Sequence, residues 1–232
     1  EEIVFTWPNP IAKTVRSCII PTDVMVGLDL SGSMNNDGGT PPEPINTARS
    51  SAARFVSNLQ DQDQVGVVTF ASDAVLRAPL SSQTQQAADT ISALTIDPAE
   101  EQGFTNTAAA LQIVGEEFAS PRVNADARRV LVILTDGLPT TPDDDVDFNA
   151  IVREEAQALA GQGIEIYAIG LGAEVDRDLI GDLATAPQRA YFAPDRSDLQ
   201  DIYEEISTSI CELGPAKIDV LPKTDANFAP LR

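Results

Sequence analysis

Four short runs of the chain are almost wholly apolar, and segments with a different periodicity separate them. The runs are Val24–Leu30, Val65–Ala71, Arg129–Thr135 and Ile164–Leu171. A strand that is apolar at nearly every position must be covered on both faces, which is typical of parallel sheets. The intervening segments carry apolar residues at helical spacing, as Ile45–Leu59 does. Strands that alternate with helices predict a doubly wound α/β domain, with a mostly parallel central sheet and helices on both faces.

Shorter segments complete this alternation. Ala74–Leu80 is expected to pair with Val65–Ala71 as a hairpin. Further helices are expected at Thr84–Leu94, Thr107–Phe118, Val146–Ala160, Asp176–Ala184 and Ser197–Ile210, with a short strand at Arg189–Phe192. We expect Gly161 to end the helix that starts at Val146, and Asp195 or Ser197 to cap the last helix.

Three regions are distinguished along the chain. Residues 18–211 hold the α/β pattern, and 232 residues suffice for one sizeable core. Residues 1–17 are expected to form an arm, with a β-like run at Ile3–Trp7. Residues 212–232 are expected to be a linker or the start of a further module, with a β-like run at Lys217–Leu221.

Acidic residues outnumber basic ones and are spread along the chain. The formal net charge is −21, which argues against nucleic acid or an anionic membrane as a partner because both are polyanions. No apolar run approaches the roughly 20 residues that span a bilayer, so no membrane insertion is expected. No signal peptide is visible at Glu1, so the chain is either mature or trimmed. The absence of His removes the commonest general base.

Oxygen-bearing side chains alternate where the first apolar run ends, in Asp29-Leu30-Ser31-Gly32-Ser33. Alternate residues of an extended segment point the same way, so Asp29, Ser31 and Ser33 are candidates to face one centre. Hard cations such as Mg²⁺ prefer oxygen ligands, and hydroxyls supply them without negative charge. Asp136 also follows an apolar run, and ligands of doubly wound sheets bind outside the carboxyl ends of strands.

Two later segments make this pattern specific. Gly103-Phe104-Thr105-Asn106-Thr107 precedes an expected helix, and Thr135-Asp136-Gly137 follows an expected strand. With the segment that begins at Asp29, their order and spacing resemble a von Willebrand factor type A (vWA) domain from about Pro21 to Cys211, particularly those of bacterial surface and pilus adhesins. Phe104 departs from this family's pattern, which usually has Gly at that position, and the loop from Asn35 to Pro44 is longer than in its shortest members.

The resemblance implies a Rossmann-like vWA fold and a metal-ion-dependent adhesion site. By motif position, the metal ligands would be Asp29, Ser31, Ser33, Thr105 and Asp136. The ion would be Mg²⁺, or Mn²⁺ or Ca²⁺ in its place. Its open coordination position would accept an Asp or Glu carboxylate from a partner protein, with no bond broken.

Three features leave alternatives open. Asp143-Asp144-Asp145, with Asp147, is either a second Ca²⁺ site or, as we favour, a solvated loop that caps the next helix. Met34 and Phe104 are either exposed rim contacts or buried. Cys18 and Cys211 lie at the two ends of the α/β region, so they form either a disulfide, which implies export, or two buried thiols.

The favoured function is an extracellular adhesion module within a larger multidomain surface protein. A vWA subunit of an intracellular assembly is the first alternative. An enzyme is the second alternative, and the only enzyme class still considered is a metal-dependent hydrolase. The glycine signatures of dinucleotide and ATP binding are absent, and a chain without His has no Ser-His-Asp triad.

Overall fold

The computed structural model describes residues 20–35, 42–96, 104–137, 139–140, 147–173 and 175–211. Its strands are β1 (Thr22–Asp29), β2 (Gln64–Phe70), β3 (Ala74–Ser81), β4 (Arg128–Thr135), β5 (Ile164–Leu171) and β6 (Ala190–Ala193). Its α-helices are α1 (Ile45–Ser57), α2 (Thr84–Ser92), α4 (Thr107–Phe118), α5 (Phe148–Gly161), α6 (Arg177–Leu183) and α7 (Leu199–Ile210). Short 3₁₀ turns occupy Gly32–Asn35, Pro187–Arg189 and Arg196–Asp198.

The strands form one sheet in the order β3-β2-β1-β4-β5-β6. All neighbours are parallel except β2 and β3, which form the expected antiparallel hairpin. The chain builds outward from β1 to β2 and β3, then crosses to the other side of β1 to add β4, β5 and β6. The strand order therefore switches between β1 and β4, which lie side by side.

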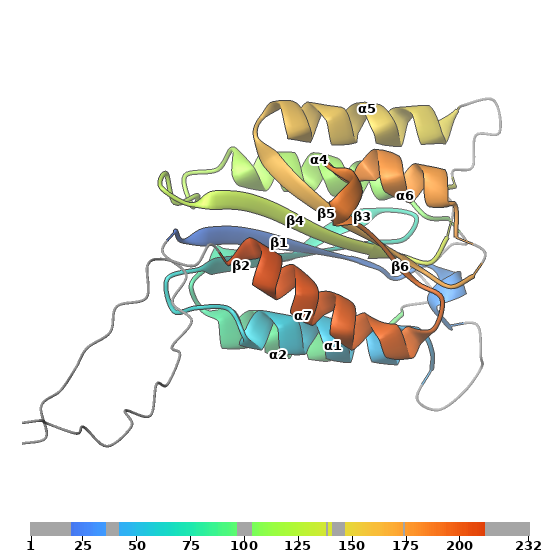
Figure 1. Ribbon diagram of the computed structural model, residues 1–232, viewed down its shortest axis with the longest axis horizontal. Helices are drawn as coiled ribbons and strands as arrows, with labels where there is room; N and C mark the ends of the chain where they lie inside the picture. Colours follow the sequence, from blue (N-terminus) through green and yellow to red (C-terminus); the bar gives the residue numbers. More distant parts are fainter. Residues whose placement is uncertain are drawn as a thin grey trace, which may run out of the picture.

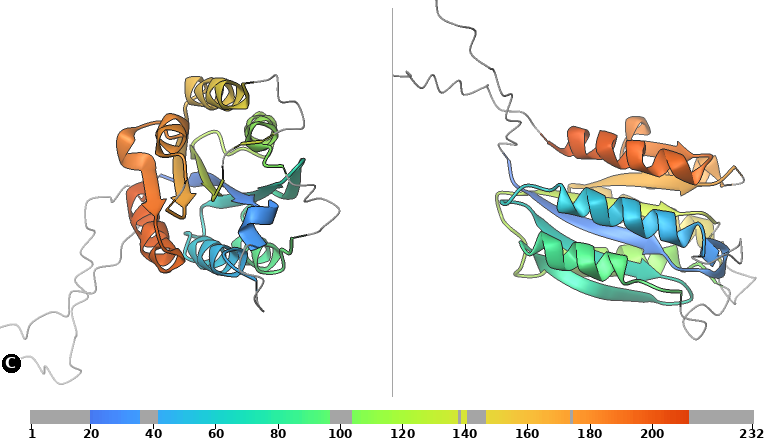
Figure 2. Two further views of the ribbon diagram at one scale, coloured as in Figure 1. Left: turned by 90° about the vertical axis from the view of Figure 1, so that its right-hand side faces the viewer. Right: turned by 90° about the horizontal axis from the view of Figure 1, so that it is seen from below.

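Helices cover both faces of the sheet, as the alternation predicts (Figure 1). Helices α1, α2 and α7 lie on one face, and α4, α5 and α6 on the other; both views of Figure 2 agree. Successive side chains of β1 point to opposite faces of the sheet and so contribute to the hydrophobic cores on both faces. Val24, Val26 and Leu28 pack under the first set of helices, and Met25 packs under the second. All eight residues of β1 are buried, as expected of a central parallel strand.

Helix ends differ slightly from the sequence prediction. Helix α5 ends at Gly161, as predicted, but the glycine with left-handed backbone (φ 78°) is Gly163, two positions further on. Asp195, one of the two expected caps, accepts a hydrogen bond from the Ser197 backbone N–H (2.9 Å). It caps the 3₁₀ turn that leads into α7.

Several predicted features lie outside the described residues: the N-terminal arm, the segment 212–232, Cys18 and Asp143-Asp144-Asp145. The division into arm, domain and linker stays a prediction. No described helix is both long and apolar enough to cross a bilayer.

Two buried carboxyl groups lie at the amino ends of β1 and β2. Asp23 accepts a hydrogen bond from the Asn124 N–H at Oδ2 (2.7 Å), while its Oδ1 has no partner. Asp63 accepts hydrogen bonds from the Thr22 and Gln60 N–H groups, both at 2.9 Å. Burial raises the pKa of both carboxyls, and the charge of Asp63 raises that of Asp23 further.

Replacing Asp23 should change how stability depends on pH. A raised pKa means that folded Asp23 holds its proton to a higher pH than the unfolded chain does, so the contribution of Asp23 to stability falls as pH rises above about 4. We expect the free energy of unfolding of Asp23→Asn to fall less steeply over this range, measured by denaturant titration at several pH values. The exposed Asp126→Asn is the control. Parallel pH curves for Asp23→Asn and wild type would contradict this interpretation of Asp23.

Candidate metal centre

The carboxyl ends of the two central strands place the predicted site residues at one edge of the sheet. β1 ends at Asp29 and β4 at Thr135, immediately before Asp136. Because neighbouring parallel strands end at the same edge, the loops after β1 and β4 meet at the switch in strand order, where doubly wound sheets bind ligands. This edge is the right-hand side of Figure 1, and the left view of Figure 2 looks onto it.

Asp29 is fully buried, and hydrogen bonds hold both of its carboxylate oxygens. Its Oδ1 accepts from the Ser31 N–H (2.8 Å), which folds the loop back over the end of β1. Its Oδ2 accepts from the Thr135 hydroxyl (2.6 Å), across 106 residues of sequence. The position of this carboxylate is therefore fixed by both central strands.

Ser31, Ser33 and Asp136 continue the cluster. The Oγ atoms of Ser31 and Ser33 are 3.0 Å apart, and the Ser33 hydroxyl donates to Asp136 Oδ1 (2.6 Å). Residues 32–35 form a 3₁₀ turn in which the Met34 N–H donates to the Ser31 carbonyl (3.0 Å), and the fully buried Met34 side chain anchors this turn. Four of the five predicted residues are thus joined by a continuous set of hydrogen bonds.

Thr105 reaches the same edge through backbone contacts. It is buried, its N–H donates to Thr140 Oγ1 (2.9 Å), and its carbonyl accepts from the Thr140 N–H (3.1 Å). The N–H of Asn106 donates to the carbonyl of Ala71 (2.6 Å), just beyond β2. The Thr105 loop is therefore tied to the strand end next to Asp29, although its side chain is outside the hydrogen-bonded set above.

The two carboxyl groups lie in an environment that disfavours negative charge. Burial raises the pKa of Asp29 to about 6, and the nearby charge of Asp136 contributes. Burial also raises the pKa of Asp136. Within the described residues, neither carboxylate has a salt bridge to Lys or Arg. A bound cation would supply the missing positive charge and favour both ionised forms.

The side-chain donors of the candidate centre are all oxygens: two carboxylates and three hydroxyls. This chemistry fits a hard divalent cation. In the described part of the chain, no three His, Cys, Asp or Glu side chains come together, so a zinc site built from thiolates and imidazoles is not present there. The residues present therefore fit the ion that the sequence pattern implies.

Sequence reasoning missed two supporting threonines. Thr135 is adjacent to Asp136, and its hydroxyl anchors Asp29; its place before Asp136 at a strand end was the available signal. Thr140 holds the backbone of Thr105, and no sequence pattern distinguishes it from an ordinary loop residue.

The open alternatives are resolved in part. Met34 is fully buried, so it is no rim contact, while Phe104 is half-buried. Asp147 caps α5 by accepting from the Ala150 N–H (3.1 Å), which is the role we favoured for this end of the acidic loop. The second Ca²⁺ site stays a prediction, because Asp143-Asp144-Asp145 is outside the described residues.

Among the residues that the structure describes, two hollows bear on function. The first, about 440 Å³, borders the candidate centre; its described lining comprises Ser33, Pro44, Asp136, Leu171, Gly172, Ala173, Pro194, Asp195 and Arg196. We call it the rim hollow.

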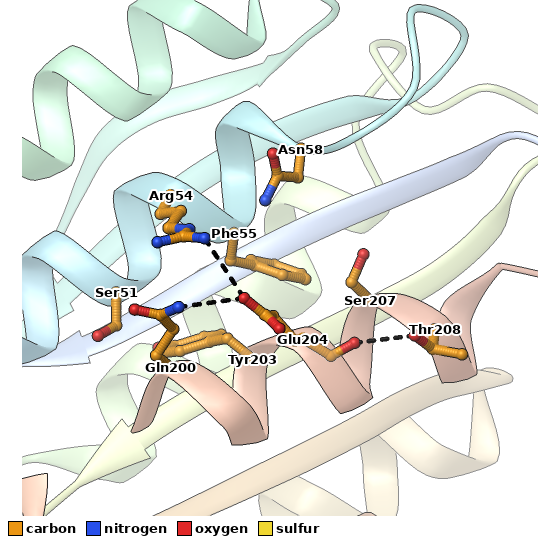
Figure 3. A pocket seen from close by; sticks show the side chains of 9 residues that line it. All are labelled: Ser51, Arg54, Phe55, Asn58, Gln200, Tyr203, Glu204, Ser207 and Thr208. Atoms are coloured by element: carbon orange, nitrogen blue, oxygen red, sulfur yellow. Dashed lines mark hydrogen bonds and ion pairs between the residues drawn. The ribbon is translucent and has the colours of Figure 1, made fainter. Parts of the chain in front are cut away.

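The second hollow, about 230 Å³, lies between α1 and α7 (Figure 3). It has an aromatic wall of Phe55 and Tyr203, whose ring centroids are 5.3 Å apart. Across it, Arg54 and Glu204 form an ion pair at 3.5 Å. It shares no described lining residue with the rim hollow.

The fold and the oxygen-rich edge define the class of this protein: a doubly wound α/β domain with a candidate cation centre at its switch point. A family model described as "von Willebrand factor type A domain" matches residues 23–205. The chain belongs to the von Willebrand factor type A domain family.

The chain is also similar in sequence to known proteins. The chain is 26% identical over 163 residues to the uncharacterized protein YfbK of Escherichia coli, covering 70% of this chain and 26% of that protein. It is 27% identical over 195 residues to the mouse collagen alpha-6(VI) chain, covering 82% of this chain and 8% of that one. The chain thus spans about a quarter or less of these relatives.

Solved structures show the same fold. Proximal thread matrix protein 1 from the mussel byssus superposes with a TM-score of 0.71 at 20% identity, covering 85% of this chain and 50% of that one. The vWF domain of the type V pili tip protein Mfa5 from Porphyromonas gingivalis also gives 0.71, at 15% identity, covering 87% and 99%.

Removing the Thr135 hydroxyl should destabilise the domain even without metal. Thr135→Val leaves the buried Asp29 Oδ2 without its donor, which should cost about 1–3 kcal/mol of unfolding free energy. Thr135→Ser keeps the hydroxyl and should recover most of this loss. Denaturant unfolding in EDTA measures both, with the exposed Thr208→Val as the control. Equal stability of the Val and Ser variants would refute the anchoring role.

Proposed function

We propose that this domain is an extracellular binding module that captures a carboxylate of a partner protein through a divalent cation. The cation would be held by Asp29, Ser31, Ser33, Thr105 and Asp136. The observation that carries the proposal is the pairing of one buried and one half-buried carboxyl group, Asp29 and Asp136, with hydroxyls at the switch point. No described Lys or Arg forms a salt bridge with either carboxyl. A bound cation would give both carboxyl groups a positively charged partner.

The five ligands would have two different roles. Asp29 and Asp136 would supply charge, while Ser31, Ser33 and Thr105 would supply neutral oxygens that leave the ion electron-poor. When bound, such an ion supplies an open coordination position for a carboxylate oxygen from outside. The protein itself fixes the oxygens in place, through Thr135 on Asp29 and Thr140 on Thr105.

Several similar proteins support an adhesive role. Relatives include collagen chains, and structural neighbours include the pilus adhesin SpaC from Lactobacillus rhamnosus GG and the Mfa5 tip protein. One mussel structure carries a zinc-occupied MIDAS motif, the metal-ion-dependent adhesion site. For this chain we propose Mg²⁺, with Mn²⁺ or Ca²⁺ as substitutes, because every side-chain donor is an oxygen. The partner would be a protein with an accessible Asp or Glu.

We propose a binding role rather than catalysis. Metal-assisted hydrolysis needs a base beside the bound water. The nearest carboxylates, Asp29 and Asp136, would be occupied as ligands, and the chain has no His. A metal-dependent hydrolase is therefore the weakest of the three functions considered.

An intracellular or membrane-associated assembly is the second candidate. It is favoured by a structural neighbour described as an aerotolerance-related membrane protein from Bacteroides fragilis. The oxidation state of Cys18 and Cys211 separates the two candidates. Cys211 follows the last residue of α7, while Cys18 is outside the described residues, so their disulfide is part of this proposal.

Divalent metal should stabilise the wild-type domain. At a free Mg²⁺ concentration 100 times the dissociation constant, binding to the folded state adds about 2.7 kcal/mol. Thermal unfolding with and without Mg²⁺ measures this, and Asp136→Asn should lose most of the shift. The exposed Asp89→Asn on α2 is the matched control and should keep it. If Mg²⁺, Mn²⁺ and Ca²⁺ all leave the melting temperature of wild type unchanged, the proposed function is wrong.

The cysteines should be oxidised in native protein. Alkylation of the denatured, unreduced chain followed by mass spectrometry should find neither Cys18 nor Cys211 modified, and both modified after reduction. Two alkylated cysteines without reductant would favour the intracellular candidate, since disulfides persist mainly in oxidising compartments.

A further inference from the structure

The rim hollow adjoins the candidate centre and contains a cationic side chain that the proposed metal site does not use. Ser33 and Asp136 form one part of its lining, and Arg196 another. Among the lining residues that the structure describes, Arg196 alone is positively charged. Its side chain is 49% exposed. A ligand group that enters the hollow next to the metal would therefore meet a guanidinium.

The acidic neighbours of Arg196 are engaged with backbone N–H groups. Asp195 accepts from the Ser197 N–H (2.9 Å), and that bond lowers the pKa of its carboxyl. Glu43 accepts from the Thr47 N–H (3.0 Å) in the first turn of α1. Arg196 Nη1 and Glu43 Oε2 form an ion pair at 4.0 Å. These carboxylates fix the ends of helical segments. Because a guanidinium has five N–H donors, Arg196 can contact these neighbours and a further acidic group at the same time.

The overall charge makes this local arrangement significant. A domain with a net charge of −21 repels an acidic partner at long range. Capture of a carboxylate therefore requires positive charge concentrated at the point of contact. The proposed cation supplies part of it, and Arg196 is placed to supply more. Arginine suits this role because its planar fork binds a carboxylate through two parallel hydrogen bonds.

We propose that the partner segment carries two acidic groups, one for the metal and one for Arg196 in the rim hollow. Arg196 is then a specificity residue that selects a diacidic segment over one with a single carboxylate. The inference rests on the proposed function, because the first carboxylate is the one that binds the metal. It adds the chemical class of the partner.

Labelled peptides of stated composition test this selection. One glycine-flanked peptide carries a single Asp, and a series carries two Asp separated by none to three Gly. Dissociation constants are measured by fluorescence polarisation in saturating Mg²⁺ for wild type, Arg196→Gln, Arg196→Lys and Arg54→Gln. Arg54 is the control, since it is an exposed arginine in the other hollow. The Mg²⁺-induced rise in melting temperature verifies that each variant still folds and binds metal.

Wild type should bind the best diacidic peptide about tenfold more tightly than the single-Asp peptide. Arg196→Gln should reduce this ratio to about one, Arg196→Lys should keep part of it, and Arg54→Gln all of it. A ratio near one in wild type, with Mg²⁺-dependent binding of both peptides, overturns the role of Arg196 and leaves the proposed function standing. A metal-loaded wild-type domain that binds no acidic peptide overturns both proposals.

Discussion

The hydrogen bond between the Thr135 hydroxyl and Asp29 joins the ends of the two central strands. The rest of the candidate centre depends on it, because it fixes a buried carboxylate at the point where the strand order reverses. Asp29 accepts a hydrogen bond from the Ser31 N–H. The Ser31 hydroxyl contacts the Ser33 hydroxyl, which in turn donates to Asp136. A carboxylate without ordered donors in this place would be too costly to bury.

Packing and chemistry are linked through the alternation of side chains along β1. Its apolar residues fill the cores on the two faces, so the strand is held rigidly along its length. Its last residue, Asp29, carries the first polar group of the site. Met34 plays a similar part beyond the strand: its buried side chain anchors the turn that carries Ser33. A precise polar site is thus supported by apolar packing on either side of it.

Much of this fold follows from local periodicity. Thr107–Phe118 and Ile164–Leu171 form the expected helix and strand at the expected bounds, because their apolar patterns are unambiguous. Helix α5 ends at Gly161 as expected, but the left-handed backbone that follows it is at Gly163, because the chain turns two residues later than a glycine cap at Gly161 would require. The contact of Thr140 with Thr105 could not be predicted, because it joins two loops 35 residues apart.

The sequence alone determined the class of fold, the family resemblance and the five residues proposed to bind metal, because periodicity and motif spacing are local properties. Tertiary structure decided which side chains support those residues and what lies beside them. Thr135, Thr140 and Arg196 come to the site from separate segments, and only the meeting of parallel strand ends and helix starts at one edge brings them together. Contacts across large sequence separations depend on the packing of the whole domain, so no local pattern records them.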